Sequence, residues 1–243
     1  MGKIPGTAFA SAIGLNESNQ LSIPLNGSTT TARVYNSGTT QPALATIVLG
    51  HGAGAGQESA FLVEFARALA ALGVDVVTFN FPYTEARRRI PDRPPILEAC
   101  YHAVVTDIHA RVQSAARHLF IGGKSMGGRI ATHIAAADPA LPISGIVLLG
   151  YPLHPPGKPE QRRDKHLPAI KQPMLIVQGS RDAFGTPPEL EPVLRAVPSA
   201  TLHVVNGGDH SFKVSKRDPA AQAAVYAGVQ QATVQWMRRV IRT

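Results

Sequence analysis

The stretch Gly123–Gly127, which reads Gly-Lys-Ser-Met-Gly, is the first feature of the sequence that could do chemistry. It follows the apolar run His118–Gly122 and precedes a helical pattern. Small residues two positions before and after Ser125 are typical of a nucleophile elbow, a strained strand-to-helix turn that exposes the serine hydroxyl. The N–H of Met126 would lie at the start of the helix, where unpaired donors face developing negative charge. We therefore predict Ser125 as a nucleophile and Met126 as an oxyanion-hole donor.

Two other interpretations of this stretch have to be weighed. Gly-Lys-Ser also ends the phosphate-binding P-loop, but that loop needs a glycine five residues before its final glycine. His118 occupies that position, inside the predicted strand, which excludes a P-loop. A glycine-rich packing corner between a strand and a helix remains as an alternative to a catalytic elbow.

A serine hydroxyl is a weak nucleophile without a general base, and the base needs a carboxylate to orient it. Asp182 and His210 follow two successive predicted strands after Ser125, in the order serine, acid, histidine. We predict these three residues as catalytic. Asp209 is the competing acid, Asp182 could instead cap a turn, and His210 could be a surface-loop histidine.

A second glycine-rich stretch, Gly50–Gly56, follows an apolar strand. A dinucleotide-binding loop would need an acidic residue at the end of the next strand, and that strand ends in Phe79-Asn80-Phe81. The loop is therefore better suited to supply the second oxyanion donor, for which we choose the N–H of Ala53, with that of Gly54 as the next choice. The candidate substrate-binding residues are His51, Gly54, Tyr83, Lys124 and His154.

Apolar runs bounded by Gly, Pro or Asn alternate with longer helical patterns, which predicts an α/β fold with a mostly parallel, doubly wound sheet and helices on both faces. The turn Asn26-Gly27 between two short strands predicts an antiparallel hairpin at the N-terminus. The expected strands are 21–25, 31–35, 45–50, 74–79, 118–122, 143–149, 173–178 and 201–205, and the expected helices are 58–72, 95–117, 127–137, 187–196 and 219–242.

The connection 151–172 is too short for a large cap domain, so we expect a minimal lid and an open site. It carries His154, Lys158, Arg162, Arg163 and His166, which could face an anionic substrate or solvent. The run Arg87–Arg89 allows the same two interpretations.

The length of 243 residues, with 44% hydrophobic and 16% charged residues, predicts one domain over residues 1–243, with 1–19 as a flexible N-terminal segment. The single cysteine, Cys100, excludes an intrachain disulfide and a thiolate zinc cage, and no metal or organic cofactor is expected. No signal peptide and no membrane-spanning run are recognisable, which predicts a cytoplasmic protein with no membrane partner.

The net charge of +8 and the pI near 10.0 raise the question of a nucleic-acid partner. The basic residues are spread along the chain and no nucleic-acid motif accompanies them, which disfavours such a partner. The same charge would steer an anionic small molecule favourably.

The sequence resembles the α/β-hydrolase superfamily over nearly its whole length and, more narrowly, KANL3/Tex30-type proteins near the dienelactone-hydrolase branch. The stretches that carry the narrower resemblance are 51–56, 79–83, 122–129, 150–159 and 179–185. The resemblance implies an α/β-hydrolase fold and a hydrolase of undefined natural substrate, and some eukaryotic relatives serve as subunits of complexes.

Together these observations predict a serine hydrolase that cleaves an ester, thioester or lactone of a small, anionic or neutral substrate through an acyl-enzyme. The alternative is a catalytically silent interaction module of the KANL3/Tex30 type with a protein partner. The sequence leaves the oligomeric state open.

Overall fold

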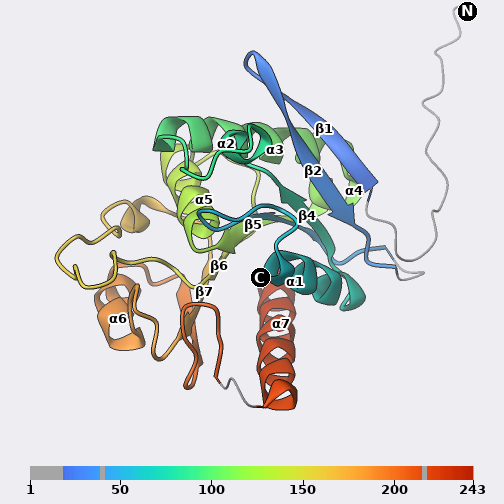
Figure 1. Ribbon diagram of the computed structural model, residues 1–243. Helices are drawn as coiled ribbons and strands as arrows, with labels where there is room; N and C mark the ends of the chain where they lie inside the picture. The colour runs from blue at the N-terminus through green and yellow to red at the C-terminus, as the bar shows by residue number, and fades with distance from the viewer. Residues whose placement is uncertain (1–18, 39–41, 215–217, 243) are drawn as a thin grey trace, which may run out of the picture.

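Eight strands form one sheet in the order β1-β2-β4-β3-β5-β6-β7-β8 in a computed structural model that describes residues 19–38, 42–214 and 218–242 (Figure 1). The strands are β1 (Asn19–Leu25), β2 (Ser28–Tyr35), β3 (Thr46–Gly50), β4 (Asp75–Phe79), β5 (Leu119–Lys124), β6 (Gly145–Leu149), β7 (Met174–Gly179) and β8 (Ala200–Val205). The helices are α1 (Ala60–Ala71), α2 (Pro82–Glu85), α3 (Pro94–Arg111), α4 (Gln113–Arg117), α5 (Met126–Ala137), α6 (Pro187–Ala196) and α7 (Pro219–Arg242). Apart from Asn19, the predicted flexible segment lies outside the described residues.

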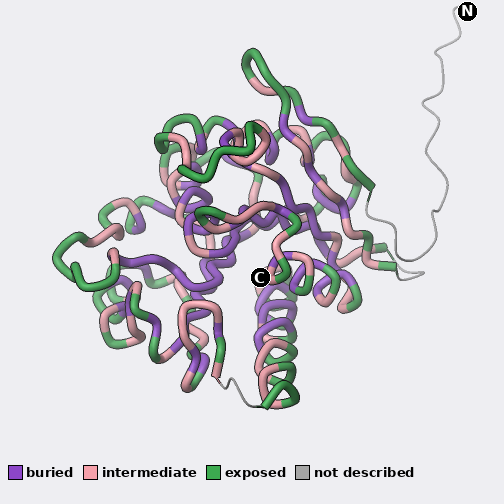
Figure 2. Tube along the Cα trace, viewed as in Figure 1, coloured by how far each residue is buried: buried purple, intermediate pink, exposed green. Residues whose placement is uncertain are grey.

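The sheet is parallel from β4 through β8, and β1 and β2 add to it as an antiparallel hairpin. Gly27, with φ of 78°, forms the hairpin turn at the predicted Asn-Gly position. The central strands are buried on both sides, as their continuous apolar runs require, and the hairpin tip is exposed (Figure 2). The predicted architecture of a mostly parallel sheet with an N-terminal antiparallel hairpin is confirmed.

Helices cover both faces of the sheet because neighbouring strand residues point to opposite sides. On one face, Leu62 and Phe65 of α1 and Trp236 of α7 pack in one cluster with the strand residue Ile47. On the other face, side chains of α3, α5 and α6 pack in a second cluster with Val48. Both hydrophobic layers therefore hold the carboxyl ends of the parallel strands at one common edge.

Three local differences from the sequence prediction have simple causes. The expected long helix 95–117 is interrupted at Val112, whose backbone is extended with φ of −104° and ψ of 116°, and α3 and α4 result. The short helix α2, which begins with Pro82, was not predicted. Strand β5 continues to Lys124, because Gly123 and Lys124 still pair with β6 despite the low strand propensity of glycine.

The connection 151–172 runs without a strand, and its one helical element is the short 3₁₀ turn η1 (Leu167–Ala169). No cap domain is inserted there. In the part of the chain that the structure describes, every helix is too short or too polar to cross a membrane.

Candidate active site

Ser125 lies at the junction of β5 and α5 in a strained backbone conformation, with φ of 51° and ψ of −113°. The strain is held by close packing of the turn on the end of β3. A Cβ atom added to Gly123 would lie 2.2 Å from the carbonyl oxygen of Gly50, and one added to Gly127 would lie 2.1 Å from the same oxygen. Glycines are therefore needed on both sides of Ser125, because any larger residue at either position would clash with β3.

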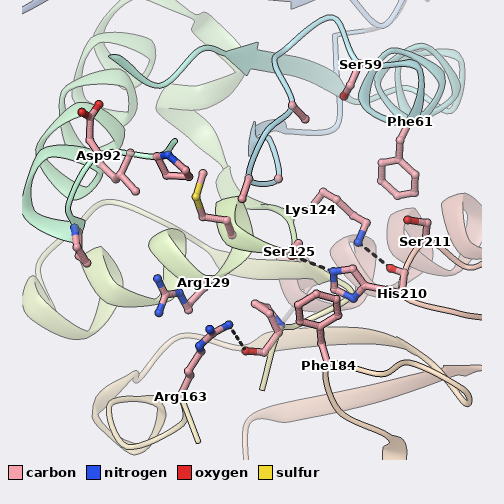
Figure 3. A pocket seen from close by; sticks show the side chains of 18 residues that line it. Ser59, Phe61, Asp92, Lys124, Ser125, Arg129, Arg163, Phe184, His210 and Ser211 are labelled. Carbon is pink, nitrogen blue, oxygen red and sulfur yellow. Dashed lines mark hydrogen bonds between the residues drawn. The ribbon is translucent and has the colours of Figure 1, made fainter. Parts of the chain in front are cut away.

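The structure brings together the three residues that the sequence predicts as catalytic, and Figure 3 shows the contact of Ser125 with His210. Ser125 Oγ lies 2.8 Å from His210 Nε2, and His210 Nδ1 lies 2.8 Å from Asp182 Oδ2. Ser125 follows β5, Asp182 follows β7 and His210 follows β8, so the parallel strands deliver all three to the same edge of the sheet. This arrangement can pass a proton from the serine hydroxyl to the imidazole.

Asp182 is 1% exposed and is held by two further donors. The N–H of Phe184 donates to its Oδ1 over 2.8 Å, and Gln178 Nε2 donates to its Oδ2 over 2.9 Å. The competing acid Asp209 accepts hydrogen bonds from the backbone N–H groups of Ser211 and Lys213 instead. The carboxylate that contacts His210 is thus that of Asp182.

The His210 loop is fixed by two neighbours. The Phe184 ring stacks on the imidazole with centroids 4.2 Å apart, and Lys124 Nζ donates to the backbone carbonyl of His210 over 2.7 Å (Figure 3). Burial lowers the pKa of the Lys124 ammonium to about 8, while the charges of Asp182 and Asp209 act in the opposite direction. Lys124, a candidate substrate-binding residue, lines the cavity with its ammonium directed at the His210 loop.

Ala53 and Met126, the predicted oxyanion-hole residues, both line the cavity beside Ser125. Neither N–H donates to an acceptor within residues 19–38, 42–214 or 218–242. Met126 is the first residue of α5, so its N–H is one of the unpaired donors at the positive end of a helix dipole. Two free donors on the wall beside a serine hydroxyl can stabilise an oxyanion.

The cavity in front of Ser125 has a volume of about 580 Å³. Its wall combines apolar side chains with four charged residues, Asp92, Lys124, Arg129 and Arg163. It is lined by Gly52, Ala53, Ala55, Ser59, Phe61, Pro91, Asp92, Pro94, Leu97, Lys124, Ser125, Met126, Arg129, Pro152, Arg163, Phe184, His210 and Ser211.

The other four candidate substrate-binding residues do not line this cavity. His51 is fully buried, its Nε2 accepts from the N–H of Phe81 over 3.1 Å, and burial lowers its pKa to about 4. The Tyr83 hydroxyl accepts from the N–H of Gly54 over 3.3 Å. These contacts tie the Gly50–Gly56 loop to α2, so His51, Gly54 and Tyr83 shape the loop that carries Ala53.

His154 is also turned away from the cavity. Its side chain is buried, with Nε2 3.1 Å from Glu189 Oε1 and Nδ1 2.9 Å from the carbonyl of Pro155. It joins the connection 151–172 to α6. Of the five basic residues considered in that connection, the one on the cavity wall is Arg163.

Sequence reasoning missed several residues of this site, among them Phe184, Gln178 and Arg129. Gln178 is the last side chain of β7 before its terminal glycine, and no motif marked it. Arg129 follows Ser125 by four residues in α5, one helical turn, and this spacing could have placed both on one face.

Within the described part of the chain, no group of three or more His, Cys, Asp or Glu side chains is arranged to hold a metal ion. The site described above is built from a serine, a histidine, a carboxylate and backbone donors.

Comparison with known proteins gives matches over most of the chain. A family model described as an alpha/beta hydrolase domain matches residues 43–238. Est1E from Butyrivibrio proteoclasticus with ferulic acid bound is similar with a TM-score of 0.70 at 14% identity, covering 88% of this chain and 98% of that one. A dienelactone hydrolase from Anabaena variabilis is similar with a TM-score of 0.67 at 18% identity, covering 88% and 95%. A serine hydrolase without a lid from Xanthomonas campestris is similar with a TM-score of 0.67 at 19% identity, covering 91% and 98%. At these identities the likeness shows a shared fold.

Proposed function

The chain belongs to the alpha/beta hydrolase family, and from this membership we propose that it is a serine hydrolase that cleaves an ester-type bond through an acyl-enzyme. The observation that carries the proposal is the chain of hydrogen bonds from Ser125 through His210 to Asp182, at an elbow with positive φ at the serine. A packing corner alone gives no reason for a strained serine to meet an imidazole that is itself bound to a buried carboxylate.

In the proposed mechanism, Ser125 Oγ attacks the substrate carbonyl carbon while His210 Nε2 accepts its proton. Asp182 holds the Nδ1–H of His210 and stabilises the imidazolium that forms. The N–H groups of Met126 and Ala53 stabilise the oxyanion, and one such donor contributes about 3 kcal/mol. His210 then protonates the leaving group as the carbonyl re-forms, which leaves the acyl group on Ser125.

Water completes the cycle. His210 accepts a proton from the water that attacks the acyl carbon, and then returns it to Ser125 Oγ as the acid product leaves. No group other than these side chains, two backbone donors and water is needed to balance the reaction.

The substrate is proposed to be a small ester, thioester or lactone. A cavity of about 580 Å³ suits a small organic molecule. The similar proteins include an Est1E structure with ferulic acid bound and a dienelactone hydrolase, which supports a small ester or lactone. The narrower kinship with KANL3/Tex30-type proteins and the cytoplasmic location both stay predictions.

Covalent labelling with a fluorophosphonate probe, read by intact mass, tests this proposal. Wild type is expected to gain one probe, and the Ser125→Ala and His210→Ala variants are expected to lose labelling. Ser211→Ala is the matched control, because Ser211 is another serine on the same cavity wall. It should label like wild type.

Two results would contradict the proposal. Labelling that survives in Ser125→Ala would place the reactive group elsewhere, and a folded wild type that neither labels nor hydrolyses short p-nitrophenyl esters would favour the alternative of a silent interaction module. A pull-down with the intact chain would then be the next experiment.

A further inference from the structure

Two arginine side chains line the cavity, and neither forms an ion pair with a carboxylate of the described residues. Arg129 comes from α5 and Arg163 from the connection 151–172, and both border the cavity in front of Ser125 (Figure 3). In the described part of the chain, the Arg129 guanidinium makes no hydrogen bond or ion pair. Arg163 reaches the carbonyl of Pro152 through Nη1 at 3.4 Å. By contrast, Arg162, next to Arg163, is paired with Asp164.

The two guanidinium groups interact unfavourably. The pKa of Arg163 is lowered, first by burial and then by the positive charge of Arg129. Like charges held near each other raise the energy of the empty site. An anion bound between the two guanidinium groups would relieve their repulsion. A guanidinium binds a carboxylate with two parallel N–H donors.

The other two charged residues on the wall have partners other than the two arginines, although Asp92 Oδ2 meets no hydrogen-bond donor among the described residues. Asp92 Oδ1 accepts from Arg88 over 2.6 Å, and Lys124 Nζ donates to the His210 carbonyl. The cations that remain for a ligand are Arg129 and Arg163. In Figure 3 they lie on the opposite side of Ser125 from Phe61 and Lys124, so the two guanidinium groups share one end of the cavity.

We propose that Arg129 and Arg163 form a carboxylate subsite, and that the substrate is an ester-type compound that carries a free carboxylate at one end. The hydrolytic part of this statement rests on the proposed function. The carboxylate part rests on the two arginines alone. A singly charged carboxylate suits the site better than a doubly charged phosphate, because the Asp92 carboxylate lines the same cavity and repels added negative charge.

Two matched pairs of esters test the subsite. In the first pair, mono-p-nitrophenyl adipate carries a carboxylate on its acyl side and p-nitrophenyl hexanoate is its neutral partner. In the second pair, butyryloxybenzoate carries a carboxylate on its leaving group and its methyl ester is the neutral partner. The quantity to compare is the ratio of kcat/KM for the charged ester to that for its neutral partner.

In at least one pair, Arg129→Gln and Arg163→Gln are each expected to lower this ratio about tenfold, as the loss of one charge-assisted hydrogen bond implies. Lys165→Gln is the control, because it removes one positive charge from an exposed position of the same segment that does not line the cavity. Its ratio should equal that of wild type. Thermal melting of each variant checks that the fold is kept.

Binding of adipate to the Ser125→Ala variant, measured by calorimetry, separates this inference from the proposed hydrolysis. Binding that weakens about tenfold on adding Arg129→Gln supports the subsite even if no ester is cleaved. Two results would overturn the subsite and leave the hydrolase proposal intact. One is ester cleavage in which the charged-to-neutral ratio of kcat/KM is unchanged in both arginine variants. The other is adipate binding whose affinity is unchanged by both substitutions.

Discussion

At the scale of single residues, Gln178 is a buried side chain that supports the proposed acid. Its Nε2 donates to Asp182, to the carbonyl of Gly185 and to that of Tyr151, while its Oε1 accepts from the N–H of Tyr151. All its hydrogen-bonding groups are used. Gln178 therefore fixes both the Asp182 carboxylate and the start of the connection after β6.

Replacing Gln178 with Leu should lower kcat on p-nitrophenyl esters about tenfold or more with little change in KM. A hydrogen bond to a charged group contributes about 1.5–3 kcal/mol, and the bond to Asp182 acts on the position of His210 and not on the substrate. Steady-state kinetics measure both constants. Gln230→Leu, a change of the same kind in α7 outside the cavity wall, is the control, and equal losses of kcat in the two variants would contradict this role.

Lys124 makes the stability of the protein depend on pH. Burial lowers its pKa from 10.5 to about 8, so the folded protein binds this proton more weakly than the unfolded chain does. The charged ammonium therefore costs stability below about pH 8, and that cost is relieved as the pH rises from 8 to 10.5.

The Lys124→Met variant lacks this titrating group. Between pH 7 and pH 10, the free energy of unfolding of wild type should rise relative to that of Lys124→Met by about 2 kcal/mol. Urea unfolding of both proteins at the two pH values measures the difference. A difference that stays constant, or that falls with pH, would contradict a lowered pKa at Lys124.

At the scale of elements, the position of Ser125 depends on how closely α5 and β3 approach. A Cβ atom added to Gly50 would lie 3.0 Å from the Cα atom of Gly127, so the first turn of α5 lies on the end of β3 with no room for a side chain between them. The same glycines that permit the elbow therefore also set the distance between the helix and the sheet.

Gly127→Ala should destabilise the fold by about 3 kcal/mol or more and abolish labelling at Ser125. The added methyl group meets backbone atoms that cannot rotate away, which is the costly form of overpacking.

Gly228→Ala in α7 is the matched control, since nothing lies within 4 Å of its added Cβ. An alanine in the middle of that helix should stabilise the protein by about 0.5–1 kcal/mol. Urea denaturation compares the two, and similar effects of both changes would refute the packing argument.

At the scale of the whole molecule, one sheet separates two hydrophobic layers. The single tryptophan, Trp236, is 3% exposed on α7, and its ring lies 5.9 Å from that of Phe120 on β5. Strand β5 is also the strand that ends at Ser125. A tryptophan on one face of the sheet therefore reports on the strand that positions the site.

Tryptophan fluorescence, far-UV circular dichroism and ester hydrolysis should all be lost at the same urea concentration. Both helical layers pack on the same central strands, so neither can unfold while the other keeps its core, and the transition is expected to be two-state. The measurement also tests the predicted single domain. A fluorescence transition that precedes the loss of activity would indicate that α7 unfolds independently.

The sequence by itself determined the succession of the eight strands along the chain, the N-terminal hairpin and the elbow around Ser125. These features depend on local patterns: continuous apolar runs make buried parallel strands, Asn-Gly makes a hairpin turn, and glycines flank a strained serine. The positions of Asp182 and His210 after later strands also follow from chain order, because parallel strands end at one edge of the sheet.

The tertiary structure decided which side chains face the cavity. Asp182 and not Asp209 contacts His210. The side chains of His51, Tyr83 and His154 are buried in contacts away from the cavity, whereas Arg129 lines it. No local pattern carries this information. The direction of a side chain depends on the path of its loop or the phase of its helix against elements that are far away in sequence, and only the packed fold fixes both.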